Sequence, residues 1–220
     1  MKLSPIEARV IGSLAEKQLT TPQQYPLTIN ALVSACNQTS NRDPVVAYDD
    51  GTVELALSSL REVGLLRLVH PSHGRSATRY RQVLDERFGL GARSLSILAV
   101  LLLRGPQTVG ELRARTERMA DFGSLADVEA DLDRMAEGDD PLVGRLPRRP
   151  GQKEERWAET LSTAASEPSD TTEITDQPDR VHQGPTSDEI ASLRSDVDIL
   201  QQEVGRIAAD VAELRTALGL

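Results

Sequence analysis

The residues best suited to chemistry lie in one short stretch, YPLTINALVSACNQTSNRDPV, at positions 25–45. It contains the only cysteine of the chain, Cys36. A catalytic thiol needs a neighbouring histidine or a helix N-terminus to lower its pKa. The pattern instead puts Cys36 at the C-terminal end of a short helix, where the helix dipole raises the pKa of a thiol. None of the three histidines forms a sequence-level dyad with it.

We therefore expect Cys36 to be a small buried residue that closes the angle between two helices. The polar residues that follow it would cap and brace the turn through bonds to the backbone; they are Asn37, Gln38, Asn41 and Arg42. The alternative is a redox-sensing thiol, which requires that modification of Cys36 change binding or dimerisation.

Other signatures of catalysis are missing from the sequence. It has no Walker-type loop, no G-x-S-x-G and no H-E-x-x-H. One cysteine excludes an intrachain disulfide and a cysteine-rich zinc site. The acid pairs Asp49-Asp50 and Asp139-Asp140 are interpreted as cap and turn residues rather than metal ligands. The sequence thus predicts a non-enzyme with no catalytic residues, no metal and no cofactor.

The elements that position these residues follow a recurring order. Ser4-Pro5-Ile6-Glu7 is a typical helix start with a capping box. Further helices are expected to begin near Thr28 and Asp50, and LLRLV and ATRYRQV read as a hairpin. The same order recurs with a helix over 93–103, helices capped by Thr108 and Ser124, and a hairpin made by PLVGRL and EERWAETL.

The repeat is also visible in the letters. PLTINAL at 26–32 matches PQTVGEL at 106–112, and GRSATRY at 74–80 matches GQKEERW at 151–157. The first pair is offset by 80 residues and the second by 77, which indicates insertions between the motifs, most simply in the loop at 37–50. Three helices and a two-stranded wing make up the winged helix-turn-helix plan.

We predict a mainly α fold with small β wings, an α+β class, made of tandem winged-helix domains at 1–88 and 89–161. Residues 162–185 are rich in Ser, Thr, Pro and acid, which is typical of a disordered linker. A heptad follows at 186–220 and predicts a parallel two-stranded coiled coil and a homodimer. Its core positions are Ile190, Leu193, Val197, Leu200, Val204, Ile207, Val211, Leu214 and Leu218.

The opening stretch LSPIEARVIGSLAEKQLTTPQQYPLTINALVSACNQTSNRDPV resembles the signature of the YceH-like family of bacterial proteins. The resemblance covers roughly residues 3–160. It implies tandem winged-helix domains and no known catalytic role, and it gives no mechanism.

Charge leaves two kinds of partner open. The net charge is −9, but residues 1–160 hold 21 basic and 22 acidic residues, so the excess acid lies in the last quarter. Clustered cations around the two predicted wings could bind the phosphates of double-stranded DNA. These candidates are Arg75, Arg79, Arg81, Arg145, Arg148, Arg149, Lys153 and Arg156.

The predicted third helices favour a protein partner instead. The helix that would enter the DNA groove begins with Asp49, Asp50 and Glu54 in the first copy. In the second copy it carries Asp127, Glu129, Asp131 and Asp133. These carboxylates would repel phosphates and suit a basic protein surface.

Two charge reversals distinguish these hypotheses. Arg148 and Arg149 to Glu should abolish DNA binding, and Asp131→Lys should disrupt docking. The sequence shows no signal peptide and no apolar run long enough to span a bilayer, so we expect a cytoplasmic protein without membrane contact.

Overall fold

The computed structural model describes residues 2–70, 77–148, 152 and 154–163. These residues belong to one compact unit. The heptad at 186–220 and nearly all of the 162–185 segment lie outside the described residues. The folded part reaches at least Thr163, because the Thr163 N–H donates to the Leu3 carbonyl, the Leu3 N–H donates to the Leu161 carbonyl, and Ser162 is buried.

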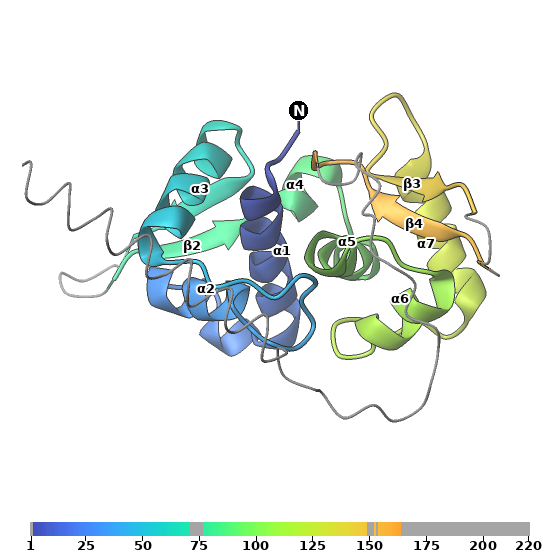
Figure 1. The fold of residues 1–220 in the computed structure, drawn as a ribbon, viewed down its shortest axis with the longest axis horizontal. Coiled ribbons are helices and arrows are strands. Elements are labelled where there is room, and N and C mark those ends of the chain that lie inside the picture. Colours follow the sequence, from blue (N-terminus) through green and yellow to red (C-terminus); the bar gives the residue numbers. More distant parts are fainter. Residues whose placement is uncertain (1, 71–76, 149–151, 153, 164–220) are drawn as a thin grey trace, which may run out of the picture. The chain divides into compact units, whose positions relative to one another are not determined.

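The first half contains three main helices followed by a hairpin (Figure 1). Ser4 and Glu7 form the expected capping box, and Thr28 and Asp49 cap the next two main helices. The elements are α1 (Pro5–Thr20), a 3₁₀ turn (Pro22–Gln24), α2 (Ile29–Cys36), α3 (Asp50–Glu62), β1 (Leu66–Val69) and β2 (Arg79–Gln82). Strands β1 and β2 are antiparallel, with Leu68 opposite Tyr80.

The second half repeats this order. Thr108 and Ser124 cap its second and third helices, each with a capping box. The elements are α5 (Ala92–Arg104), α6 (Val109–Thr116), α7 (Leu125–Ala136), β3 (Val143–Leu146) and β4 (Arg156–Glu159). A five-residue helix, α4 (Leu84–Phe88), joins the halves and was not expected from sequence. Over the described ranges, the protein is thus a mixed α+β fold of seven α-helices and two small antiparallel sheets.

The two repeated sequence motifs meet in space in each half. Leu27 and Tyr80 exchange backbone N–H···O bonds, and Gln107 and Trp157 do the same. Arg79 donates to the Pro26 carbonyl at 2.8 Å, and Arg156 donates to that of Pro106 at 3.1 Å. The proline of the first repeated motif and the arginine of the second are therefore hydrogen-bonded to each other in each half.

Helices α1 and α5 form the centre of the core and pack against each other (Figure 1). Every residue of α1 from Ala8 to Glu16 is buried, as is every residue of α5 from Ser94 to Leu103. Gly12 permits the close approach, because a Cβ there would lie 2.9 Å from Leu102 Cβ. The two halves thus share one core rather than each closing its own.

Among residues 2–70, 77–148, 152 and 154–163, no helix combines the length and the apolar character needed for a transmembrane span.

Candidate functional site

Cys36 ends α2 and is fully buried. Burial raises the pKa of its thiol above the ordinary value, so the reactive thiolate is disfavoured at neutral pH. Within the described part of the chain, no three His, Cys, Asp or Glu side chains are grouped so that they could hold a metal ion. Cys36 is therefore a packed core residue at the turn that follows α2.

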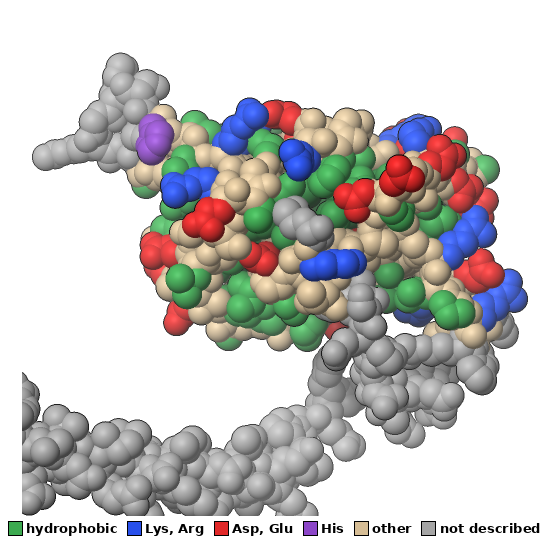
Figure 2. Space-filling view, turned by 90° about the horizontal axis from the view of Figure 1, so that it is seen from above, with side chains coloured by type: hydrophobic (Ala, Val, Ile, Leu, Met, Phe, Trp, Pro, Cys, Tyr) green, Lys and Arg blue, Asp and Glu red, His purple; other side chains and the backbone are tan. Residues whose placement is uncertain are grey.

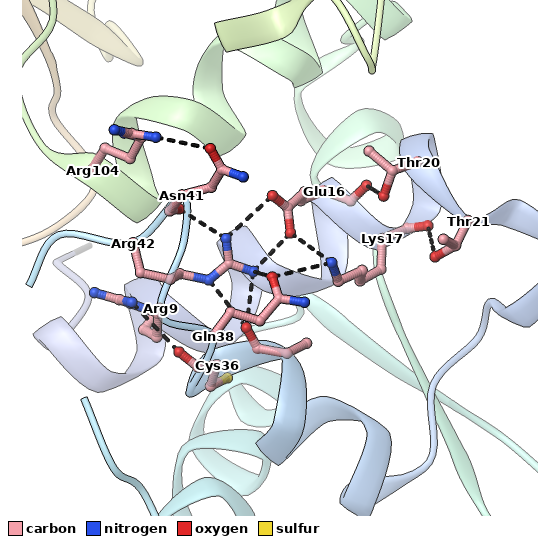
Figure 3. A network of polar contacts seen from close by, with 11 residues as sticks. Arg9, Glu16, Lys17, Thr20, Thr21, Cys36, Gln38, Asn41, Arg42 and Arg104 are labelled. Carbon is pink, nitrogen blue, oxygen red and sulfur yellow. Dashed lines mark hydrogen bonds and ion pairs between the residues drawn. The ribbon is translucent and has the colours of Figure 1, made fainter. Parts of the chain in front are cut away.

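The turn after Cys36 is organised by Arg42 (Figure 3). The Arg42 side chain is completely buried and donates to both carboxylate oxygens of Glu16, at 3.2 and 2.7 Å. It also donates to the carbonyls of Ala35 and Asn41 and to Gln38. Asn37 secures the far end of the loop by pairing with both backbone groups of Tyr48. The guanidinium of Arg42 thus joins α1, α2 and the loop in one network.

Glu16 is the missing partner that the sequence did not reveal. Burial alone would raise the pKa of its carboxyl group, but hydrogen bonds and charge from Arg42, together with Lys17, outweigh burial. The pKa of Glu16 is therefore lowered, and the carboxylate is held in its charged form. Glu16 lies 26 residues before Arg42, so no local pattern pairs them.

Arg9 was also missed. It is buried and donates to the carbonyl of Pro44 at 2.6 Å and, more weakly, to that of Cys36 at 3.5 Å. Arginine is usually exposed in folded proteins, so the burial of Arg9 in α1 could not be predicted from the sequence.

The same loop connects the two halves of the protein. It has 13 residues (37–49) between α2 and α3, whereas the equivalent loop has 8 (117–124) between α6 and α7. The backbone N–H of Asp43 donates to the Leu103 carbonyl at 2.9 Å, and Arg104 donates to Asn41 at 2.9 Å. The longer loop, where the repeat offsets indicated insertions, thus contacts the end of α5.

The predicted wing arginines are engaged in local contacts. Arg79 and Arg156 hold the proline carbonyls described above. Arg81 pairs with Glu86, and Arg148 and Arg145 both approach Glu155. Arg145 also pairs with Asp133 and lies 4.7 Å from the ring centre of Trp157. The remaining three candidates, Arg75, Arg149 and Lys153, lie outside the described residues.

Charges of both signs are mixed over the surface seen in Figure 2, where Lys and Arg are interspersed with Asp and Glu. Exposed ion pairs of this kind contribute less than about 1 kcal/mol each. The carboxylates therefore hold the wing arginines only weakly. The face seen in Figure 2 shows no large patch of a single sign.

The acids of the third helices have different roles in the structure. Asp49 and Asp127 serve the N-terminal caps of α3 and α7. Asp131 is buried, accepts from Ser94 at 3.1 Å and pairs with Arg134. The expectation that Asp131 presents its charge to a partner is therefore wrong, because it occupies a core-facing position. Asp131→Lys would test folding rather than docking.

What α3 does present is an exposed leucine beside acids. Leu55 is 76% exposed, the highest value among the large apolar side chains that the structure describes as exposed. Gly51 and Ser58 lie one turn away on either side of it, and Glu54 and Glu62 are exposed nearby. On α7, Leu125 is exposed together with Glu129 and Asp133. The outer face of α3 thus has an exposed leucine at its centre, the carboxylates of Glu54 and Glu62 along it, and one cation, Arg61, in its last turn.

Comparison with known proteins agrees with the family expected from the opening stretch only in part. Residues 3–152 match a family described as "Protein of unknown function, DUF480". A UPF0502 protein of Geobacter metallireducens is 53% identical over 162 residues, which cover 74% of this chain and 73% of the relative. A UPF0502 protein of Geotalea uraniireducens is 40% identical over 215 residues, covering 98% of this chain and 97% of the relative.

Proposed function

We propose that this chain, which belongs to the DUF480 family, is a non-enzymatic binding protein that docks onto a basic protein surface. Each half would be a winged helix-turn-helix domain, as the resemblance to the YceH-like family implies. Three helices, a hairpin wing and a short strand segment pairing with the wing support this assignment. A coiled coil at 186–220 would join two such chains.

The outer face of α3 is the observation that carries the proposal. A helix that reads DNA places its exposed face against base edges and phosphates. Here that face bears Leu55 with two carboxylates, Glu54 and Glu62, against one cation, Arg61, in the last turn. Burying a leucine side chain contributes about 1.5–3 kcal/mol, whereas carboxylates in the groove repel the phosphates. The combination suits a partner with an apolar pocket and a basic rim.

Site-specific photo-crosslinking tests this docking. A photoreactive amino acid at position 55 should trap a protein whose contacting surface is basic. Adding Glu54→Lys should abolish that adduct, because it reverses a charge at the edge of the interface without touching the core. The matched control, Glu129→Lys on the exposed face of α7, should leave the α3 adduct intact. An adduct that survives Glu54→Lys would contradict the proposal.

Binding of double-stranded DNA by the wings is the second candidate. At the first wing Arg67 and Arg81 share the single carboxylate of Glu86, which leaves an excess of positive charge. Fluorescence anisotropy of labelled random-sequence duplex DNA should then show binding that weakens steeply with salt, and the slope would count the phosphates neutralised. Reversal of Arg67 and Arg81 to Glu should remove the contribution of the first wing to that binding, and reversal of Arg148 and Arg149 to Glu should remove that of the second. If DNA does not bind even at low salt, only docking remains.

A further inference from the structure

A cavity lies where the two halves meet. It is bounded by the C-terminal part of α1, the 37–49 loop, the end of α5 and the end of α6. Its volume is about 350 Å³, within the range of about 300–1,000 Å³ that small-molecule sites occupy. Asn41 reaches it from one half and Arg104 from the other, joined by the bond already described. The cavity therefore exists because the longer loop of the first half lies against the second.

Positive charge predominates in this cavity. Lys17, Arg104, Arg115 and Arg118 line it. Of the acids that line it, Glu16 is already bound by Arg42 and Lys17, which leaves Glu117 as its other carboxylate within the described structure. With Lys17 paired to Glu16, the three arginines face the cavity with Glu117 as the one remaining carboxylate of the lining that the structure describes.

The cations also crowd one another. Burial lowers the pKa of the Arg115 guanidinium, and the nearby charge of Arg104 lowers it further. The carboxylate of Glu111, 3.5 Å from Arg115, offsets this only in part, and Glu111 also pairs with Arg156. Among the described residues, no hydrogen bond or ion pair is formed by the Arg118 side chain. An anion placed between these groups would relieve the repulsion and use donors that are free.

The other residues that line the cavity indicate which class of anion it could bind. Val100, Leu103 and Met119 supply an apolar side, and Gln38 and Ser40 add uncharged polar groups. No aromatic side chain belongs to the lining formed by the described residues. A nucleobase would therefore find no ring to stack on. Guanidinium groups bind phosphate oxygens in paired, charge-assisted hydrogen bonds.

We propose that this cavity binds a small phosphorylated molecule, with its phosphate groups held by Arg104, Arg115 and Arg118. The ligand would contact the 37–49 loop of one half and α5 and α6 of the other. Binding would therefore fix the junction between the halves and stabilise the folded protein, since a ligand bound only by the native state adds to its stability. This site is independent of the α3 docking face.

Calorimetric titration of the full chain with inorganic tripolyphosphate tests the site. Arg118→Glu should weaken binding about tenfold or more, because a charge-assisted contact is replaced by repulsion. Arg115→Gln should act in the same direction. Arg113→Glu is the matched control: Arg113 lies on α6 with Arg115 and five residues before Arg118, is exposed, and does not belong to the cavity lining. It should leave the affinity unchanged within about twofold.

The three methionines give a second readout that locates the ligand. With ¹³C-methyl methionine, tripolyphosphate should shift the resonance of Met119, which lines the cavity, and leave that of buried Met135 unmoved. The proposal is overturned by an absence of binding at millimolar tripolyphosphate, by an unmoved Met119 resonance, or by equal losses in Arg113→Glu and Arg118→Glu. Binding of duplex DNA at a phosphate concentration at which tripolyphosphate does not bind would also overturn it.

Discussion

The individual residues that matter most for the fold form a buried ion pair. Arg42 and Glu16 are both removed from solvent, and their geometry is bidentate. Removing one partner of such a pair destabilises the protein strongly even where the net contribution of the pair is small, because the other charge stays buried without its counter-ion. The pair therefore keeps the 37–49 loop in one position, and that loop in turn contacts the second half.

Glu16→Gln should lower the free energy of unfolding at pH 7 by about 3 kcal/mol. The lowered pKa of Glu16 means that its contribution is present above the unfolded value, about 4.3, and is lost as pH falls through the folded value. Urea unfolding at pH 7, 5 and 3 should therefore show a large difference between wild type and variant at pH 7 that shrinks at pH 3.

The exposed pair of Arg67 with Glu86 provides the control. Glu86→Gln should cost less than about 1 kcal/mol, because both side chains stay in water. A loss at Glu16→Gln no greater than at Glu86→Gln, or one that persists undiminished at pH 3, would show that the buried pair does not brace the loop.

At the scale of elements, the decisive contact is the crossing of α1 and α5. Gly12 lies directly against α5, and an added Cβ would meet Leu103 Cγ at 3.1 Å as well as Leu102 Cβ. The neighbouring Cβ of Leu102 is fixed to the backbone, so it can move away only with α5. A methyl group at this position must therefore separate the helices.

Gly12→Ala should destabilise the protein by about 1–3 kcal/mol even though alanine is the better helix former. Gly110→Ala, near the start of α6, is the comparison, since the atom nearest to its new Cβ is 4.0 Å away. That change should be neutral or stabilise the protein by up to about 1 kcal/mol. Thermal and urea unfolding of the two variants measures the difference, and equal effects would contradict the close approach.

The helix starts could be predicted from sequence because they are local. Ser4, Thr108 and Ser124 each cap a helix whose third residue completes a capping box, so the signal spans four residues. Helix α4 was missed because its five residues continue directly from the outgoing strand, and no capping side chain marks its start. Short helices of this kind depend on tertiary contacts such as the burial of Leu84.

The candidate site was predictable only in its local half. Cys36 and the polar residues after it stand out in the sequence, and the structure places them in one turn. Glu16 and Arg104 lie far from that turn along the chain, and they join it only through packing of α1 and α5. The misassignment of Asp131 has the same origin, because an acid on a core-facing position is satisfied by Ser94 from another helix.

For the whole molecule, the heptad at 186–220 remains a prediction from sequence. β-branched residues at most of one set of core positions and mostly leucine at the other favour a parallel dimer. Two joined chains would present two α3 faces to a partner. Linking two binding sites makes the second contact intramolecular and can raise the apparent affinity by about 10²–10⁴. Dimerisation and tight docking should therefore be lost together.

Leu200→Asp with Ile207→Asp should convert the protein into a single chain of 24.0 kDa, because two charges would replace apolar core positions of the coil. Sedimentation equilibrium measures the mass. Gln202→Asp is the matched control, since position 202 lies on the outer face of the same heptad and should leave the dimer intact. The helical content and unfolding midpoint of residues 1–163 should not change, which separates loss of the coil from loss of the fold. If the double variant is a monomer yet retains full affinity at the α3 face, then the coil does not act through avidity; if it remains a dimer, another surface joins the chains.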